Sequence, residues 1–274
     1  MTTLPTIAIL GAGSMGGAIL RGLSGPGVSV HGGIRVTNRT ESKAALLRTE
    51  GVLSLSLEAH PLANQQAVVG ARIVILGVKP AMVPDLLRDI AASLLPDSIV
   101  ISVAAGVSTT TMQAIVPGVV LRAMPNTPAL IGRAVTGLSA GSRATEHDVH
   151  LAKKVFETVG TVLELAESKI DALSTISGSG PAYVFYLIEQ LTATAVSMGF
   201  TADEARIMVH GTFAGAVELL ISSAETTAEL RRRVTSPNGT TERAIAVLES
   251  AGLGDLFGRA TAAALTRARE LAEG

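Results

Sequence analysis

The sequence contains no cysteine and no tryptophan among its 274 residues. The lack of cysteine excludes disulfides, thiol nucleophiles and zinc sites built on cysteine. Aromatic residues make up only 3% of the chain, which is too few for a platform on which nucleic-acid bases stack. An excess of charge of one sign is also missing, since 22 Lys and Arg and 23 Asp and Glu leave a net charge of −1. The chain therefore has no overall field that would attract nucleic acid or an anionic membrane.

Membrane-crossing apolar runs are not evident either, although 47% of the residues are hydrophobic. Residues 98–121 carry no charge, but Ser, Thr and Gln side chains and the Pro117-Gly118 pair interrupt them. A spanning helix needs about 20 predominantly apolar residues. The N-terminus lacks the basic region and cleavage site of a signal peptide and is typical of a strand that enters a turn. We expect a cytoplasmic protein that binds neither membrane nor nucleic acid.

Residues 1–166 alternate short apolar runs with helical stretches. Several runs are rich in Val and Ile and nearly continuous, as in parallel strands that are covered on both faces. The candidate strands are Thr6–Leu10, Ile34–Thr37, Ile73–Val78, Ile99–Ala104, Val119–Met124, Val135–Ser139 and Val162–Leu165. The helices predicted between them are Met15–Leu23, Ala81–Leu94 and Glu146–Val159, the last with Thr145 as N-cap and Gly160 as its stop. This order predicts an α/β, doubly wound, mainly parallel Rossmann-type domain.

Residues 167–274 lose the strand pattern and are predicted to be all helical. Capping signatures at Thr201/Glu204 and Thr226/Glu229 mark two helix starts. The other helices are expected at Pro181–Met198, Thr240–Ser250 and Asp255–Glu273. The helix that begins at Pro181 is notably apolar and has few charged residues on any face, so it is either the centre of a monomeric bundle or buried in an oligomer. We favour the oligomer.

A glycine turn follows the first predicted strand and opens the first helix. Its sequence, Gly11-Ala12-Gly13-Ser14-Met15-Gly16, fits the pattern G-x-G-x-x-G in the context that a dinucleotide-binding fold requires. The first glycine permits the turn, the second lets the backbone approach a pyrophosphate, and the third allows the helix to pack on the strand. The helix N-terminus then offers free N–H groups to the phosphates. A purely structural turn is the alternative.

The end of the second strand distinguishes the two nicotinamide cofactors. An NAD site places Asp or Glu there to bind the ribose hydroxyls. This sequence has Asn38, Arg39 and Thr40 instead, which can pair with and donate to a 2′-phosphate. We therefore predict that NADPH is preferred over NADH. The alternative is that Arg39 is a solvated loop residue.

Three further strand ends are expected to meet at the same crevice, because ligands bind outside the carboxyl ends of parallel strands. Their small residues and rigid prolines suit a flat nicotinamide ring. Lys79 is either a catalytic acid, a contact to ribose or a residue that closes the end of the sheet. The residues expected to bind the cofactor there are Val78, Lys79, Pro80, Ala104, Ala105, Gly106 and Asn126.

Several motifs of the chain resemble those of the pyrroline-5-carboxylate reductase family. The most specific of them are Ser177-Gly-Ser-Gly-Pro-Ala-Tyr183 and Val234-Thr-Ser-Pro-Asn-Gly-Thr-Thr241, followed by Glu242–Glu249. Gly77-Val-Lys-Pro80 and Met124-Pro-Asn-Thr-Pro128 are family-like and are shared more loosely with other reductases of this fold.

The resemblance implies reduction of a cyclic imine, L-1-pyrroline-5-carboxylate, to L-proline with NAD(P)H, the last step of proline biosynthesis. It implies an NADP-binding Rossmann domain over residues 1–166 and a helical dimerisation and substrate domain over 167–274. A homodimer with intertwined C-terminal helices is expected, and pentamers of dimers occur in the family. By position, Asn64 resembles a residue that contacts the cofactor and Glu167 one near the substrate. Asn238 stands where many members have glycine.

The substrate of such a reaction is an imine that bears a carboxylate. The loop before Thr240–Ser250 supplies backbone N–H groups at a helix start, so Ser236, Gly239, Thr240 and Thr241 are expected to bind it. A donor close to the imine nitrogen stabilises the transition state of hydride addition. Thr241 is predicted to be that catalytic hydroxyl, which either orients the iminium or relays a proton from water. The alternative is that Thr240 or Thr241 caps the helix.

Other signals are given simpler interpretations. His147 and His150 lie in a charged helix start, so no metal site is predicted. Arg231, Arg232 and Arg233 suit a helix C-terminus, with a cofactor phosphate as the alternative. Ser177 does not lie in the elbow of a serine hydrolase. A β-hydroxyacid dehydrogenase would need a lysine early in the helical domain, and a non-catalytic NADP sensor would not need the second anion loop.

Overall fold

The computed structural model describes residues 1–273, and they form two compact units. The first unit comprises Met1–Ser179 together with the chain from Ala264 onward, and the second comprises Gly180–Ala263. The first unit holds every strand found in the described residues, whereas the second is built from helices.

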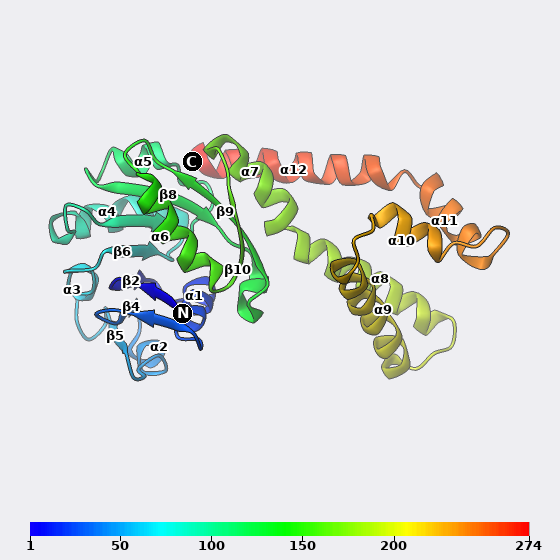
Figure 1. Ribbon diagram of the computed structural model, residues 1–274, viewed down its shortest axis with the longest axis horizontal. Coiled ribbons are helices and arrows are strands. Elements are labelled where there is room, and N and C mark those ends of the chain that lie inside the picture. Colours follow the sequence, from blue (N-terminus) through cyan, green and yellow to red (C-terminus); the bar gives the residue numbers. More distant parts are fainter. Residues whose placement is uncertain (274) are drawn as a thin grey trace. The chain divides into compact units, whose positions relative to one another are not determined.

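The sheet of the first unit has eight strands in the order β10-β9-β8-β7-β6-β2-β4-β5 (Figure 1). All neighbouring pairs are parallel except β8 and β9. The central strand β2 lies between β4 and β6, so the chain order reverses at its carboxyl end, where open α/β sheets bind ligands. The strands are β2 (Ile7–Leu10), β4 (Ile34–Asn38), β5 (Val52–Ser56), β6 (Ile73–Leu76), β7 (Ile99–Ser102), β8 (Val119–Met124), β9 (Ala134–Ala140) and β10 (Gly160–Glu164). A separate parallel pair joins β1 (Thr2–Leu4) to β3 (Val28–Val30).

The core is split into two layers because alternate strand residues point to opposite faces of the sheet. On one face Ile7 and Ile9 pack with buried residues of α1 (Ser14–Leu23) and α6 (Glu146–Glu157). On the other face Ala8 and Leu10 pack with residues of α3 (Ala63–Val68), α4 (Val83–Ile90) and α5 (Thr109–Gln113). Burial on both faces explains why these strands read as continuous apolar runs.

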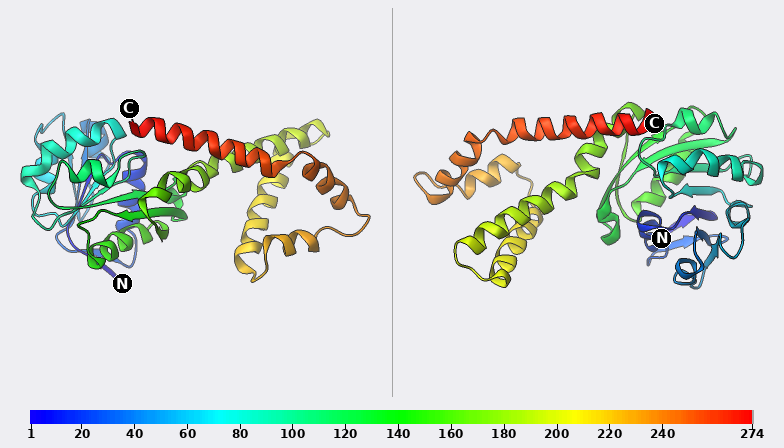
Figure 2. Two further views of the ribbon diagram at one scale, coloured as in Figure 1. Left: turned by 90° about the horizontal axis from the view of Figure 1, so that it is seen from above. Right: turned by 180° about the vertical axis from the view of Figure 1, so that it is seen from behind.

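Short helices fill most of the remaining chain of the first unit. They are α2 (Glu41–Ala45), the 3₁₀ turns η1 (Pro80–Met82), η2 (Ala91–Ser93), η3 (Thr127–Ile131) and η4 (Glu167–Lys169), α7 (Ile170–Leu173) and the π-helical turn η5 (Ser174–Gly178). In the second unit, α8 (Gly180–Ser197) and α9 (Ala202–Ser222) lie side by side (Figure 2). They are followed by α10 (Thr227–Arg233) and α11 (Thr240–Ser250). The last helix, α12, runs from Leu253 to Glu273.

The predicted fold class, a mainly parallel α/β domain followed by helices, is confirmed. The strands predicted at Ile73–Val78 and Ile99–Ala104 are each two residues shorter, because their last residues leave the sheet and turn at its edge. Gly160 was predicted to stop a helix but begins β10, and Thr158 is the C-cap of α6. The strands β1, β3 and β5 were not predicted.

The uncharged stretch 98–121 is no membrane span, since it forms β7, α5 and the start of β8. Among the described residues α9 is the one helix long and apolar enough to cross a membrane, judged by length and composition only. Only 11% of its apolar window is buried within the chain. Its neighbour α8 also leaves large apolar side chains in the open, such as Phe185 at 65% and Tyr186 at 61% exposure. The apolar helix that begins at Gly180 is therefore not the buried centre of a monomeric bundle.

The start of α6 is fixed by Asp148, a buried carboxylate that also ties the helix to the sheet. Asp148 Oδ2 accepts hydrogen bonds from the N–H and the hydroxyl of Thr145, and Oδ1 lies 2.7 Å from Arg72 Nη2. Burial raises the pKa of Asp148, but the bonds from Thr145 and the charge of Arg72 together outweigh it and hold the pKa below its usual value.

Replacing Asp148 by Asn should lower the free energy of unfolding by about 2–3 kcal/mol at pH 7, because Arg72 loses its buried partner. The pKa of Asp148 is lower in the folded than in the unfolded chain, so its contribution is present above the unfolded value and lost as the pH falls through the folded one. Urea unfolding of both proteins should show the gap closing below about pH 4. Asp97→Asn, at the exposed second partner of Arg72, is the control and should cost less than about 1 kcal/mol. A gap that stays constant from pH 7 to pH 3 would contradict this account.

Candidate functional site

The turn between β2 and α1 is packed against the end of β6 without room for side chains. Gly11 has a φ of +88°, and a Cβ added to it would lie 2.8 Å from Val78 Cγ1 and 3.0 Å from the carbonyl oxygen of Gly77. A Cβ on Gly77 would lie 2.5 Å from the carbonyl oxygen of Gly11, and one on Gly16 2.7 Å from the same oxygen. The glycines thus hold a close approach of two strand ends and a helix, while Gly13 has open space around it.

The first turn of α1 is open to an anion. Gly13 is the N-cap, and no side chain caps the helix. The first N–H groups of a helix have no partner within it, and the helix dipole adds positive potential there. The arrangement is the one that binds phosphates in dinucleotide folds.

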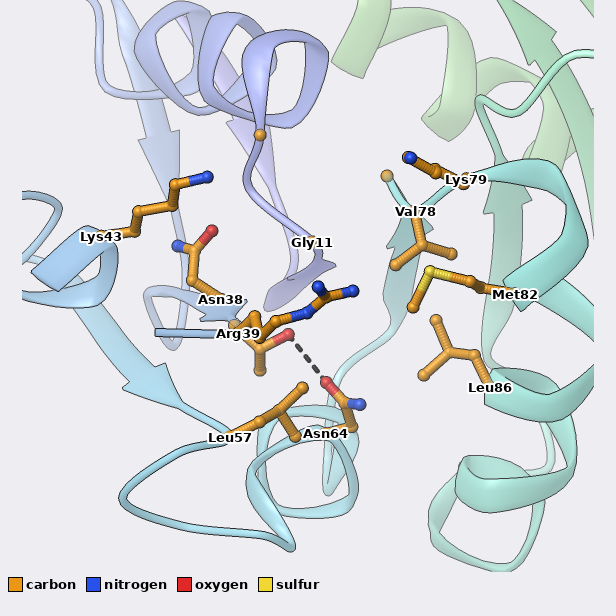
Figure 3. Close-up of a pocket in the computed structure, with 13 residues that line it drawn as sticks. Gly11, Asn38, Arg39, Lys43, Leu57, Asn64, Val78, Lys79, Met82 and Leu86 are labelled. Atoms are coloured by element: carbon orange, nitrogen blue, oxygen red, sulfur yellow. Dashed lines mark hydrogen bonds between the residues drawn. The ribbon is translucent and has the colours of Figure 1, made fainter. Parts of the chain in front are cut away.

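A cleft of about 350 Å³ opens at this turn, across the ends of β2, β4 and β6 (Figure 3). Three cationic side chains, Arg39, Lys43 and Lys79, line it, and none of the residues that line it in the described chain is acidic. Val78, Met82 and Leu86 form an apolar wall on one side. Positive charge beside an apolar wall suits a ligand with phosphates and a flat ring.

The buried amides of the cleft offer donors to a ligand. The hydroxyl of Thr37 donates to Asn64 Oδ1 at 2.8 Å, which directs the amide oxygen of Asn64 inward and fixes its orientation. Asn38 is 5% exposed, and its Nδ2 is buried without a hydrogen-bond partner. A buried unpaired donor costs free energy, so an acceptor is expected at this point of the cleft.

The predicted cofactor residues fall into three groups. Seven line the cleft, namely Gly11, Gly13, Asn38, Arg39, Asn64, Val78 and Lys79. Ala12 and Ser14 line a neighbouring hollow of about 400 Å³, which Gly13 and Lys43 also border. The remaining predicted residues line neither hollow, namely Met15, Gly16, Thr40, Pro80, Ala104, Ala105, Gly106 and Asn126.

Six lining residues lie outside the predicted cofactor set, namely Thr37, Lys43, Leu57, Gly77, Met82 and Leu86. Thr37 and Gly77 belong to strand ends that were expected at the crevice, whereas the other four were not foreseen. Leu57 directly follows β5, a strand that was not predicted, so its place at a strand end was hidden. Met82, the N-cap of α4, and Leu86 are four residues apart, a spacing that puts two side chains on one helix face. That spacing was available in the sequence.

Asn126 and Glu167 already hold partners within the first unit. Asn126 Nδ2 donates to the carbonyl oxygen of Ser177 at 2.9 Å, and its Oδ1 accepts from the N–H of Val135. Glu167 accepts from the N–H of Thr109 at 2.7 Å and from its hydroxyl, and it lies 3.9 Å from Arg122 Nη1. Cofactor binding by Asn126 and substrate binding by Glu167 stay predictions.

The predicted substrate loop lies in the second unit, between α10 and α11. Gly239 is the N-cap of α11, without a side-chain cap, so Thr240 and Thr241 are the first two helical residues and neither of them caps the helix. Asn238 has a φ of +61°, a left-handed conformation that Asn tolerates and Gly adopts freely, and its N–H donates to Glu242 Oε2. Ser236 and Thr240 are exposed, and Gly239 and Thr241 are partly exposed. The loop presents an open helix N-terminus with hydroxyls beside it.

The carboxylate between His147 and His150 and the three arginines at the end of α10 have structural partners. Asp148, between His147 and His150, is engaged by Thr145 and Arg72, and the described residues contain no group of three potential metal ligands. The three arginines at the end of α10 form ion pairs with carboxylates: Arg231 with Glu249, Arg232 with Glu229 and Arg233 with Glu225.

Comparison with known proteins gives full-length relatives. The chain is 37% identical to the pyrroline-5-carboxylate reductase of Corynebacterium melassecola, over 98% of this chain and 99% of the relative. It is 36% identical to that of Pseudomonas aeruginosa, over 98% and 97%. The structure of a pyrroline-5-carboxylate reductase from Coxiella burnetii covers 97% of each chain with a TM-score of 0.87 and 35% identity. A Plasmodium falciparum pyrroline carboxylate reductase with NADP bound shares the fold, with a TM-score of 0.83, 22% identity and coverage of 97% and 98%.

Two family models match parts of the chain. Residues 6–106 match the model described as NADP oxidoreductase coenzyme F420-dependent. Residues 167–271 match pyrroline-5-carboxylate reductase dimerisation, which indicates that the chain oligomerises and explains the exposed apolar faces of α8 and α9. With relatives of this identity over its whole length, the chain belongs to the pyrroline-5-carboxylate reductase family of NAD(P)-dependent oxidoreductases.

Proposed function

We propose that the protein reduces L-1-pyrroline-5-carboxylate to L-proline. One molecule of NADPH and one proton are consumed for each C=N bond that is reduced, and NADP⁺ is released. The full-length identity to pyrroline-5-carboxylate reductases is the observation that carries the proposal. The cation-lined cleft at the β2–α1 turn supports it.

The residues of the cleft fit a dinucleotide. Gly11 and Gly16 allow the β2–α1 turn to pack closely, and the N-terminus of α1 would face the pyrophosphate. Asn38 Nδ2 is a buried donor without a hydrogen-bond partner. When bound, the reduced nicotinamide supplies the hydride for the imine carbon. Val78, Met82 and Leu86 exclude water from one wall, and Asn64 is oriented by Thr37 to donate from its Nδ2.

The preference for NADPH over NADH is part of the proposal. Arg39 follows β4, lines the cleft, and forms no ion pair with any residue of the described chain. The acid that lies closest in sequence, Glu41, is turned to Ser56 and Arg48. A free guanidinium at the end of the second strand supports recognition of a 2′-phosphate.

The loop before α11 is proposed to bind the substrate. The carboxylate of the substrate would accept hydrogen bonds from the N–H groups at the start of α11. The helix dipole and the hydroxyl of Ser236 would add to this binding. Gly239 keeps this approach open, since a Cβ there would lie 2.9 Å from the carbonyl oxygen of Ser236. The hydroxyl of Thr241 would donate a hydrogen bond toward the imine nitrogen. That nitrogen gains electron density as the hydride adds to the imine carbon. A contact from Glu167 would have to replace a bond to Thr109 or Arg122.

The assembly and location complete the proposal. We place the boundary between the cofactor and the dimerisation domains at 166/167, close to where the dimerisation match begins. The exposed apolar side chains of α8 and α9 support a homodimer with intertwined C-terminal helices, which can associate further into a pentamer of dimers. The enzyme is placed in the cytoplasm, where reduced nicotinamide cofactor is supplied.

The activity is tested by following NADPH oxidation with pyrroline-5-carboxylate beside a panel of 2- and 3-oxo acids. Turnover is expected with the imine and not with the oxo acids. Oxidation of NADPH with an oxo acid alone would favour a hydroxyacid dehydrogenase. Binding of NADPH without any turnover would favour a sensor.

Arg39→Ala should lower the ratio of kcat/KM for NADPH to that for NADH by about 10-fold, because a charge-assisted bond to the 2′-phosphate is lost. Steady-state kinetics with both cofactors measures it. Arg88→Ala, which removes an exposed arginine of α4 paired with Asp85, should leave the ratio unchanged. An unaltered ratio in the Arg39 variant would exclude it as the source of the preference.

Thr241→Ala should lower kcat by about 10- to 100-fold, the low end of acid–base and electrostatic effects. Thr241→Ser keeps the hydroxyl and should stay close to the parent enzyme. Circular dichroism of both variants checks that the helical content of the protein is unchanged. A full kcat in the Ala variant would remove Thr241 from the catalytic step.

A further inference from the structure

We propose that Lys43 is a specificity-determining residue that, together with Arg39, binds the 2′-phosphate of NADP. The inference rests on the proposed function, because it concerns the cofactor of that reaction. The sequence pattern pointed to Asn38, Arg39 and Thr40, but Thr40 does not line the cleft and Lys43 does.

Lys43 reaches the cleft from α2, the helix that directly follows the end of β4. Asn38 is the last residue of β4, and Arg39 and Thr40 connect it to α2. Lys43 therefore lies one turn further along the same wall, and Figure 3 shows its side chain extended into the opening on the side of Asn38. The end of the second strand is where a dinucleotide fold places the adenosine ribose. Two cations and one amide donor thus come from the chain segment that faces the ribose hydroxyls.

The charge of Lys43 is available to a ligand because the acids near it are already bonded. Glu41, two residues before it, accepts from the hydroxyl of Ser56 and pairs with Arg48 Nη2 at 2.6 Å. Glu58 accepts from the N–H of Glu41 at 2.9 Å. Within the described residues Lys43 has no ion pair, and neither Glu41 nor Glu58 lines the cleft. The ammonium is left facing an opening without a counter-charge.

The unpartnered amide of Asn38 is the independent sign that an acceptor belongs beside this lysine. Asn38 is buried, its Nδ2 has no partner, and its side chain lines the cleft. A phosphate beside Lys43 and Asn38 would neutralise the ammonium, and it would also pair with Arg39 once that guanidinium, which points toward Val78 and Met82, turns to it. NADH, which has only a hydroxyl at this point, would leave the two cations unpaired.

The pyrophosphate is the other phosphate that Lys43 could meet, because it also borders the hollow next to Gly13 and Ser14 at the start of α1. The two phosphates are separated by probes that lack nicotinamide. ADP-ribose has the pyrophosphate alone, and 2′-phospho-ADP-ribose has both groups. Titration calorimetry of the full chain with each probe reads binding without turnover.

Lys43→Gln should weaken the binding of 2′-phospho-ADP-ribose by about 10-fold and that of ADP-ribose by less than about 2-fold, as expected for the loss of one charge-assisted contact. Lys43→Arg keeps the charge and should retain the selectivity. Lys153→Gln removes a lysine of α6 that pairs with Glu164 and should change neither affinity. The double variant Lys43→Gln/Arg39→Ala should show non-additive losses for 2′-phospho-ADP-ribose, since both cations act on one phosphate.

Equal weakening of both probes by Lys43→Gln would place the lysine at the pyrophosphate and overturn the proposal, as would no weakening of either. Failure of the proposed function is recognised separately, in the unaltered protein, by the absence of imine reduction with either cofactor. Imine reduction by the unaltered protein, with the selective loss above, supports both statements independently.

Discussion

The close approach of the β2–α1 turn to the end of β6 is the constraint on which the site depends. The carbonyl oxygen of Gly11 lies where a Cβ on Gly77 or on Gly16 would collide with it, at 2.5 and 2.7 Å. The N–H groups of Gly11 and Gly77 bond to Thr37 and Leu10, so the turn is fixed to strands on both sides. This packing brings the open end of α1 to the point where the sheet order reverses, and the cleft forms there.

Positive potential in this protein is local and is hidden by its near-zero net charge. Unsatisfied N–H groups at the starts of α1 and α11 supply positive potential that a charge count does not register. In the cleft, Arg39 and Lys43 add formal charge while Glu41 is held away by Ser56 and Arg48. The hydrogen bonds from Ser56 and Arg48 lower the pKa of Glu41, so Glu41 remains an anion that is bonded to these two residues. The cleft is cationic because of where the nearby acids are bonded rather than because of their number.

The sequence predicted those parts of the fold that local chemistry controls. The glycine turn, the buried strands and the capping residues Thr145 and Thr201 each follow from a pattern of a few residues, and the structure has them. It did not predict β5, because Val52–Ser56 alternates apolar and serine residues at the sheet edge and lacks the continuous apolar run of the inner strands. Leu57 was therefore missed as a lining residue. Lys43 was missed because its role depends on where Glu41 and Glu58 are bonded, which is a tertiary property. Glu167 shows the same limit, since its bonds to Thr109 join residues far apart in sequence.

The central claim is that a nicotinamide cofactor, its pyrophosphate held at the β2–α1 turn, passes hydride to the carbon of a cyclic imine. Its most direct test is turnover of pyrroline-5-carboxylate with NADPH that carries deuterium at both C4 positions of the nicotinamide, followed by mass spectrometry of the product. The account predicts L-proline with one deuterium, on the ring carbon that had been part of the C=N bond. Proline without deuterium, or oxidation of the cofactor without formation of proline, would contradict it.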